Sequence, residues 1–161
     1  MMSAHRTVPQ FGPSRRSPFR FAAAALCTAF VLMGHGTSHT AKVSYTQMQS
    51  QMEALGYKNV FIGTVEGEPE ETACENVIEA VKAAGYTKVI LRPLMVVAGD
   101  HANNDMAGED ADSWLSQFTA AGCFESVDCQ ISGLGRIADV QQLYIACLLY
   151  TSPSPRDLST S

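Results

Sequence analysis

The segment AFVLMGHG, residues 29–36, decides the fold class. It opens with a short apolar run that suits a buried β-strand, and a glycine–histidine–glycine triplet follows directly. The two glycines around His35 end the apolar pattern and let the backbone turn sharply. We therefore expect a strand over residues 29–33 that delivers His35 to one edge of a sheet.

Strand-like and helix-like segments alternate along the rest of the chain. The expected strands are residues 29–33, 59–65, 88–97 and 126–132, with Pro93 near the end or at an edge of the third. The expected helices are residues 40–55, 71–84, 110–121 and 137–149. This alternation with short connections predicts a three-layer α/β lobe, with a four-stranded parallel sheet and helices on both faces.

The two ends of the chain do not follow this pattern. Residues 1–30 carry four arginines and no acid, whereas all sixteen carboxylates come later. We expect residues 1–28 to be a leader or a non-native segment, 29–149 to be the α/β lobe, and 150–161 to be a disordered, non-native tail. A cytoplasmic location is expected, with export as the alternative if the arginine-rich apolar leader is a signal.

Composition excludes several classes of function. The formal net charge of -5 argues against nucleic acid as the main partner. The five cysteines are odd in number and contain no CxxC pair. This spacing predicts reduced, buried thiols rather than a disulfide framework or a thiolate metal site.

Polar loops follow three of the expected strands. His35 comes after the first strand, Glu66 after the second and His101 after the third. The carboxyl ends of parallel strands share one edge of the sheet, and ligands bind there. Two imidazoles and one carboxylate can hold a divalent first-row metal and leave coordination positions open. The shared placement therefore predicts a metal site, although each residue alone would usually be a surface or capping residue.

Small residues accompany these candidate ligands. Gly34, Gly36 and Gly99 are expected to let a bulky ligand approach the backbone closely. Asp100 lies in the same loop as Gly99 and either contacts that ligand or caps a turn.

His39 lies four residues after His35, a spacing that on a helix would indicate a zinc pair. The glycines exclude a helix at His35, so we expect Thr37 or Ser38 to cap the following helix. His39 is then predicted to lie in the first turn, outside the metal site.

Four segments resemble the C-terminal half of the anaerobic-pathway cobalt chelatases: VLMGHGTSH (31–39), GTVEGEP (63–69), RPLMVVAGDHANNDMAGEDADSW (92–114) and SGLG (132–135). The resemblance runs over roughly residues 29–148 and is most specific in residues 94–114. These class II chelatases are related in fold to ferrochelatase and insert Co²⁺ into sirohydrochlorin during cobalamin synthesis.

The resemblance implies two similar α/β lobes with the tetrapyrrole between them. It implies that His35 is both a metal ligand and the proton-accepting base, and that Glu66 and His101 complete the metal site. Co²⁺ is the expected metal, although Ni²⁺, Fe²⁺ and Zn²⁺ suit the same donors. No further cofactor is expected.

Because the chain resembles only the C-terminal half of these chelatases, we expect it to need a partner. The missing N-terminal lobe, or a second copy of the chain, is expected to close the cleft over the tetrapyrrole. Arg92, Lys42 or the missing lobe is expected to offset repulsion between the acidic loops and the substrate's carboxylates. The alternative function is a non-catalytic half-domain that binds metal or tetrapyrrole.

Overall fold

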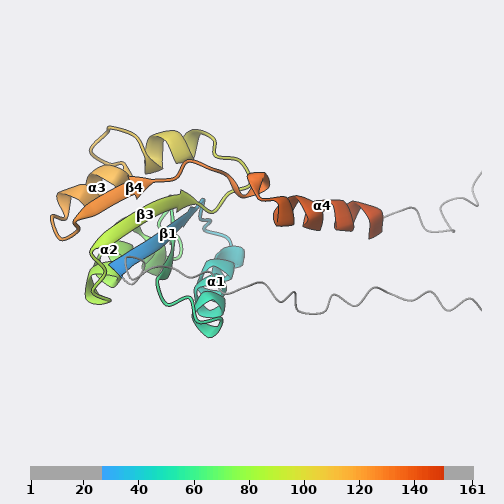
Figure 1. Cartoon of the computed structure of the whole chain (residues 1–161), viewed down its shortest axis with the longest axis horizontal. Helices are drawn as coiled ribbons and strands as arrows, with labels where there is room; N and C mark the ends of the chain where they lie inside the picture. The colour runs from blue at the N-terminus through green and yellow to red at the C-terminus, as the bar shows by residue number, and fades with distance from the viewer. Residues whose placement is uncertain (1–26, 151–161) are drawn as a thin grey trace, which may run out of the picture.

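The structure is a computed structural model that describes residues 27–150 of the 161-residue chain. Four parallel strands form one sheet in the order β2-β1-β3-β4 (Figure 1). They are β1 (Thr28–Gly34), β2 (Val60–Thr64), β3 (Lys88–Pro93) and β4 (Ser126–Cys129). The predicted four-stranded parallel sheet is thus confirmed.

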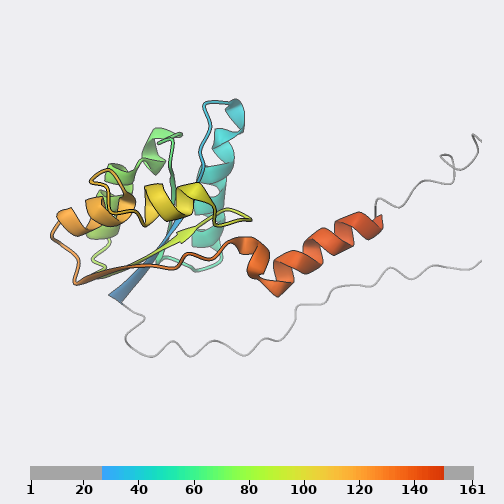
Figure 2. The same cartoon turned by 90° about the horizontal axis from the view of Figure 1, so that it is seen from above.

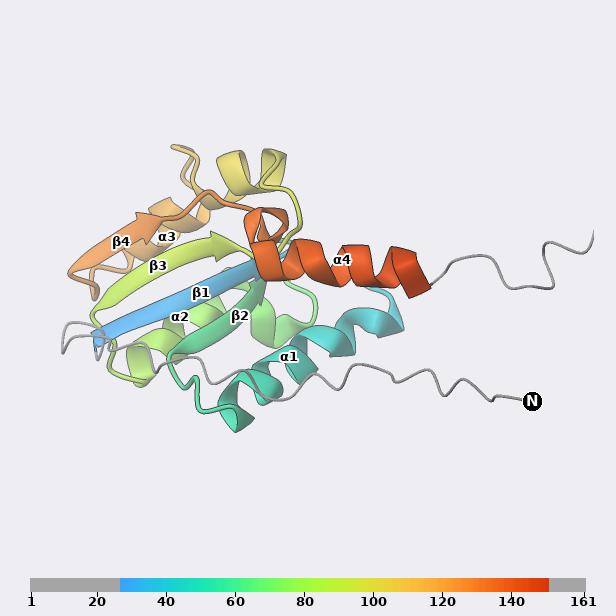
Figure 3. The same cartoon turned by 45° about the vertical axis from the view of Figure 1, so that its right-hand side comes forward.

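Helices join the strands and cover both faces of the sheet. They are α1 (Val43–Ala54), α2 (Cys74–Ala83) and α3 (Trp114–Ala120), and α4 (Ala138–Tyr150) follows β4. Right-handed crossovers in this strand order put α1 on one face and α2 and α3 on the other. Figure 3 shows α2 and α3 behind the sheet.

The main core lies between the sheet and the pair α2 and α3. Alternate residues of β1, namely Ala29, Val31 and Met33, are fully buried on this face. They pack with Val81 of α2 and Phe118 of α3, both also fully buried. Burying each of the larger side chains, the valines, Met33 and Phe118, stabilises the fold by about 1.5–3 kcal/mol. This core fixes β1 and so fixes where its carboxyl end lies.

The last helix stands apart from this core. Figure 2 shows α4 projecting away from the sheet, and four of its large apolar side chains are exposed, Leu143, Tyr144, Ile145 and Leu148. No helix within residues 27–150 is long and apolar enough to cross a membrane.

Several element boundaries differ from the sequence expectations. β1 begins at Thr28 rather than at residue 29, and α4 continues to Tyr150 rather than ending at residue 149. β3 ends at Pro93, because proline has no N–H to continue the ladder. The third helix begins only at Trp114, where Ser113 Oγ accepts a hydrogen bond from Ser116 N. Expectations for residues 1–26 and 151–161 lie outside the described residues.

The turn after β1 depends on glycine at position 36. Gly36 has a φ of +94°, which L-residues with a side chain rarely adopt. A β-carbon there would lie 2.8 Å from Glu66 Cβ and 3.0 Å from Thr64 Cβ. Because glycine has no β-carbon, the chain after β1 can lie directly against the end of β2 at this position.

All five cysteines lie within the described residues, and none forms a disulfide. The expectation of burial is wrong for Cys27, Cys123 and Cys147, which are exposed. These three lie before β1, in the turn before β4 and on the projecting α4, where no core covers them. Burial, and then the nearby charge of Glu75, raises the pKa of the Cys74 thiol to about 12.

Replacing Gly36 with alanine should lower the free energy of unfolding by about 1–3 kcal/mol, through backbone strain and contact with Glu66. Gly56→Ala is the matched control, because Gly56 has a φ of +89° but open space around a β-carbon. Urea unfolding of both variants measures the difference. Equal losses of unfolding free energy in the two variants would contradict the close packing of Gly36 against Glu66.

Cys74 should resist thiol reagents in the folded protein at pH 8, because only the thiolate reacts and burial suppresses it. Cys27, Cys123 and Cys147 should react first, and Cys74 only after unfolding. Since the pKa of Cys74 is raised by folding from 9.0 to about 12, its contribution to stability is lost as the pH rises through this range. Mass spectrometry after alkylation locates the labels, and rapid native labelling of Cys74 would contradict its burial.

Candidate metal centre

The carboxyl ends of β1 and β2 bring His35 and Glu66 next to each other. The parallel pairing continues past the strands, because Val65 N donates to Gly34 O and Glu66 N donates to His35 O, both at 3.0 Å. The two backbones therefore run side by side at the sheet edge. This position agrees with the predicted placement of His35 and Glu66 on one edge.

His101 reaches the same edge from β3. A loop over residues 94–99 follows the strand, and a helical turn then includes the π-helical segment Ala102–Met106. The rings of His35 and His101 meet edge to face, with centroids 4.7 Å apart and an interplanar angle of 85°. The structure thus brings together two of the three predicted ligands.

Both imidazoles have their Nδ1 atom engaged. His35 Nδ1 lies 3.0 Å from Gly36 O, and His101 Nδ1 lies 2.5 Å from Asp105 Oδ2. A carbonyl or a carboxylate can only accept a hydrogen bond, so Nδ1 of each ring is the donor and carries a proton. Within residues 27–150 no hydrogen bond engages the Nε2 atom of either ring. Each Nε2 lone pair is therefore free to bind a metal ion.

Glu66 is close in the backbone but does not complete the site in this conformation. Its side chain is exposed, and within the described part of the chain nothing hydrogen-bonds to its carboxylate. No three His, Cys, Asp or Glu side chains of residues 27–150 come close enough to hold one metal ion. Glu66 instead lines a cavity of about 350 Å³ together with Asp105 and Asp112. Its role as third ligand remains a prediction.

Two of the three glycines predicted to contact substrate, Gly34 and Gly36, have packing roles in this fold. A β-carbon on Gly34 would lie 2.5 Å from the Tyr45 ring, and the Tyr45 hydroxyl accepts a hydrogen bond from Gly36 N at 3.0 Å. Gly99 has open space around it, and Asp100 Oδ1 accepts a hydrogen bond from Asn104 at 2.7 Å. Substrate contact at these four positions remains a prediction.

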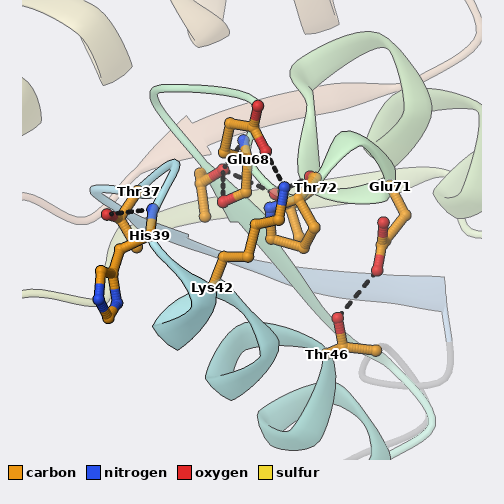
Figure 4. A network of polar contacts seen from close by, with 9 residues as sticks. Thr37, His39, Lys42, Thr46, Glu68, Glu71 and Thr72 are labelled. Carbon is orange, nitrogen blue, oxygen red and sulfur yellow. Dashed lines mark hydrogen bonds and ion pairs between the residues drawn. The ribbon is translucent and has the colours of Figure 1, made fainter.

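The expected capping by Thr37 or Ser38 is wrong. His39 itself caps the 3₁₀ turn Thr40–Lys42, where its Nδ1 accepts a hydrogen bond from Ala41 N at 3.1 Å. Thr37 Oγ1 in turn accepts from His39 N at 3.2 Å (Figure 4). An imidazole nitrogen can replace the usual hydroxyl or carboxylate cap, which propensity rules do not anticipate. His39 thus supports the chain next to the site and contributes no metal-facing nitrogen.

Polar contacts tie the loop after β2 to the start of α1 (Figure 4). Lys42 Nζ pairs with Glu68 Oε2 at 2.7 Å, and Thr46 Oγ1 donates to Glu71 Oε1 at 2.8 Å. Hydrogen bonds from the backbone and from Thr46, with the charge of Lys42 nearby, hold the pKa of Glu71 below its ordinary value. These contacts steady the loop that carries Glu66.

The sequence missed Asp105 as a residue of this site. The residues Gly99 to Asp105 are rich in glycine, asparagine and aspartate, which indicated a loop. The available signal was the spacing of His101 and Asp105, four residues apart, which on a helical turn places both side chains on one face.

Comparison with known proteins points to one family. The family model for cobalt chelatase (CbiK) matches residues 20–152. A sirohydrochlorin cobaltochelatase of Salmonella typhimurium is 41% identical over 118 residues, which are 73% of this chain and 42% of that protein. The sirohydrochlorin cobaltochelatase CbiKC of Nitratidesulfovibrio vulgaris is 37% identical over 94 residues, 58% of this chain and 32% of the relative.

The solved structures support the fold. The crystal structure of a CbiX protein from Marinobacter aquaeolei VT8 matches with a TM-score of 0.55 and 17% identity, and the match covers 83% of this chain and 99% of that one. The chain spans less than half the length of the two curated relatives. Because the family model covers most of its residues, the chain belongs to the CbiK family of cobalt chelatases.

Proposed function

We propose that this chain forms the metal-binding lobe of a sirohydrochlorin cobaltochelatase, which inserts Co²⁺ into sirohydrochlorin in anaerobic cobalamin synthesis. The observation that carries this proposal is the pair of facing rings of His35 and His101, each with Nδ1 engaged and Nε2 free. The names of the matched relatives supply the substrate and the metal.

The metal is a substrate in this reaction and must be both held and released. Two neutral imidazoles displace water from a divalent ion while leaving positions for the ring nitrogens of the tetrapyrrole. Co²⁺, Ni²⁺, Fe²⁺ and Zn²⁺ all accept imidazole donors, and the order of affinities does not favour cobalt over nickel. Supply of the ion in the cell is therefore the proposed source of selectivity.

Insertion also removes two protons from the pyrrole nitrogens. His35 is the more accessible ring, since its residue is exposed whereas that of His101 is half-buried. A neutral imidazole whose Nε2 is unprotonated can accept a proton as a general base. We assign proton acceptance to His35 and suggest that the exposed carboxylate of Glu66 swings in to complete the metal site.

We propose that a cation other than Lys42 and Arg92 binds the substrate's carboxylates. Lys42 is paired with Glu68, and the Nε of Arg92 is buried without a hydrogen-bond partner among the described residues. Arg136, by contrast, is exposed and its guanidinium makes no ion pair within residues 27–150. A guanidinium binds carboxylates through two parallel hydrogen bonds, which suits an acidic tetrapyrrole.

Arg136 lies beside an apolar hollow at the carboxyl ends of β3 and β4. This cavity of about 490 Å³ is lined by Val96, Val97 and Ile131 together with the segment that contains Gly133. A β-carbon on Gly133 would lie 2.5 Å from Val96 O, so glycine there lets the two loops pack closely. An apolar surface bordered by one cation fits a flat ring with acidic side arms.

A second lobe is needed to enclose such a ring, because His35 and the hollow are open to solvent in this chain. The N-terminal half present in longer relatives is the proposed partner, and a homodimer of this chain is the alternative. The mass of the chain in solution distinguishes the two.

His35→Ala should abolish cobalt insertion, with a loss of at least about 100-fold, because a ligand and a proton acceptor disappear together. His101→Ala should lose Co²⁺ affinity. His39→Ala is the matched control and should cost about 1 kcal/mol of stability through the lost cap, with nearly unchanged activity.

The measurement is the absorbance change of sirohydrochlorin on metal insertion, with the chain joined to the N-terminal half of a relative. Equal losses in the His35 and His39 variants, or an active His35 variant, would contradict the assignment.

A further inference from the structure

The side chain of Asp105 is the nearest acidic partner of the metal site. Its Oδ2 atom lies 2.5 Å from Nδ1 of His101, and the two residues are separated by one helical turn. Both side chains are partly covered, with relative exposures of 37% for His101 and 44% for Asp105. The contact therefore holds the ring from the side opposite to its free Nε2 atom.

The backbone that carries this pair is firmly anchored. Ala102 and Met106 of the π-helical turn are fully buried in the main core on either side of the exposed residues. Asn103 Nδ2 donates to Gly99 O at 2.6 Å, which secures the start of the same turn. The remaining freedom of His101 is rotation of its ring, and the contact with Asp105 removes it. Single π-helical turns inside helices are frequent at functional sites.

The two histidines are held by different kinds of acceptor. His35 Nδ1 bonds to the neutral carbonyl of its neighbour Gly36, whereas His101 Nδ1 bonds to a carboxylate. A carboxylate acceptor makes a stronger hydrogen bond and makes the opposite ring nitrogen a better donor to a metal. His101 is thus the more firmly oriented of the two rings.

We propose that Asp105 is the positioning residue of the metal site, fixing His101 in the Nδ1–H tautomer so that Nε2 faces the metal ion. This inference rests on the proposed function for the identity of the bound ion. It adds a residue outside the predicted set His35, Glu66 and His101. Both histidines bind the ion in the proposed site, but only His101 has its orientation fixed by a carboxylate.

Asp105→Asn is the most informative variant, because it keeps the shape of the side chain but can turn an N–H toward Nδ1 of His101. That contact would favour the Nε2–H tautomer and block the metal-facing nitrogen. Asp105→Glu restores a carboxylate and should recover part of the wild-type behaviour. Asp112→Asn is the matched control, because it removes one charge from the same cavity without contacting His101.

Long-range ¹H–¹⁵N NMR of the metal-free chain at pH 8 reports the tautomer of each histidine directly. His101 should be the Nδ1–H form in the wild type and in Asp112→Asn, and should shift toward the Nε2–H form in Asp105→Asn. The backbone amide spectrum of each variant confirms that the fold is intact. A wild-type tautomer in Asp105→Asn would overturn the proposal.

Co²⁺ titration of the same proteins gives the second readout. Affinity should fall about 10–100-fold in Asp105→Asn, as for other residues that orient a metal ligand, and less in Asp105→Glu. Equal losses in Asp105→Asn and Asp112→Asn would overturn the positioning role in favour of a simple charge effect. If the tautomer of His101 changes with the residue at position 105 but the chain binds no Co²⁺, the positioning role is supported and the proposed function is contradicted. The two proposals can therefore fail independently of each other.

Discussion

The site depends on the parallel pairing of β1 with its two neighbours at the carboxyl edge of the sheet. Leu94 N donates to Met33 O at 2.7 Å, and Glu66 N donates to His35 O at 3.0 Å, so the loops after β2 and β3 remain attached to β1 beyond the strands. Because Met33 is fully buried, the core fixes the point at which these loops separate. The positions of both histidines follow from this one constraint.

In the proposed metal site, the two histidine rings differ in how firmly they are held. A ring oriented by a carboxylate suits a lasting metal ligand, and an exposed ring held by one carbonyl suits proton exchange. A chelatase must transfer its metal, so a complete and rigid ligand cage would hinder the reaction. As the proposed third ligand, the exposed carboxylate of Glu66 fits this requirement, because nothing within residues 27–150 hydrogen-bonds to it.

Periodicity in the sequence was sufficient for the sheet, because the buried strands are short apolar runs followed by glycine or acidic loops. It located His35, Glu66 and His101 at strand ends, since parallel strands share an edge. It could not reveal the π-helical turn after Gly99, because glycine and asparagine also indicate loops. Asp105 was missed for that reason. The cap by His39 was missed because an imidazole rarely serves as a helix cap. The contact of Gly34 with Tyr45 depends on tertiary packing, which no local pattern records.

The proposed site binds the incoming metal ion through two imidazole Nε2 atoms at one sheet edge. X-ray absorption at the cobalt edge, with Co²⁺ added to the chain in less than equimolar amount, identifies the donor atoms. We expect two histidine ligands, identified by scattering from the imidazole ring, with oxygen donors in the remaining positions. A spectrum with oxygen donors alone, or with sulfur from one of the free cysteines, would contradict it.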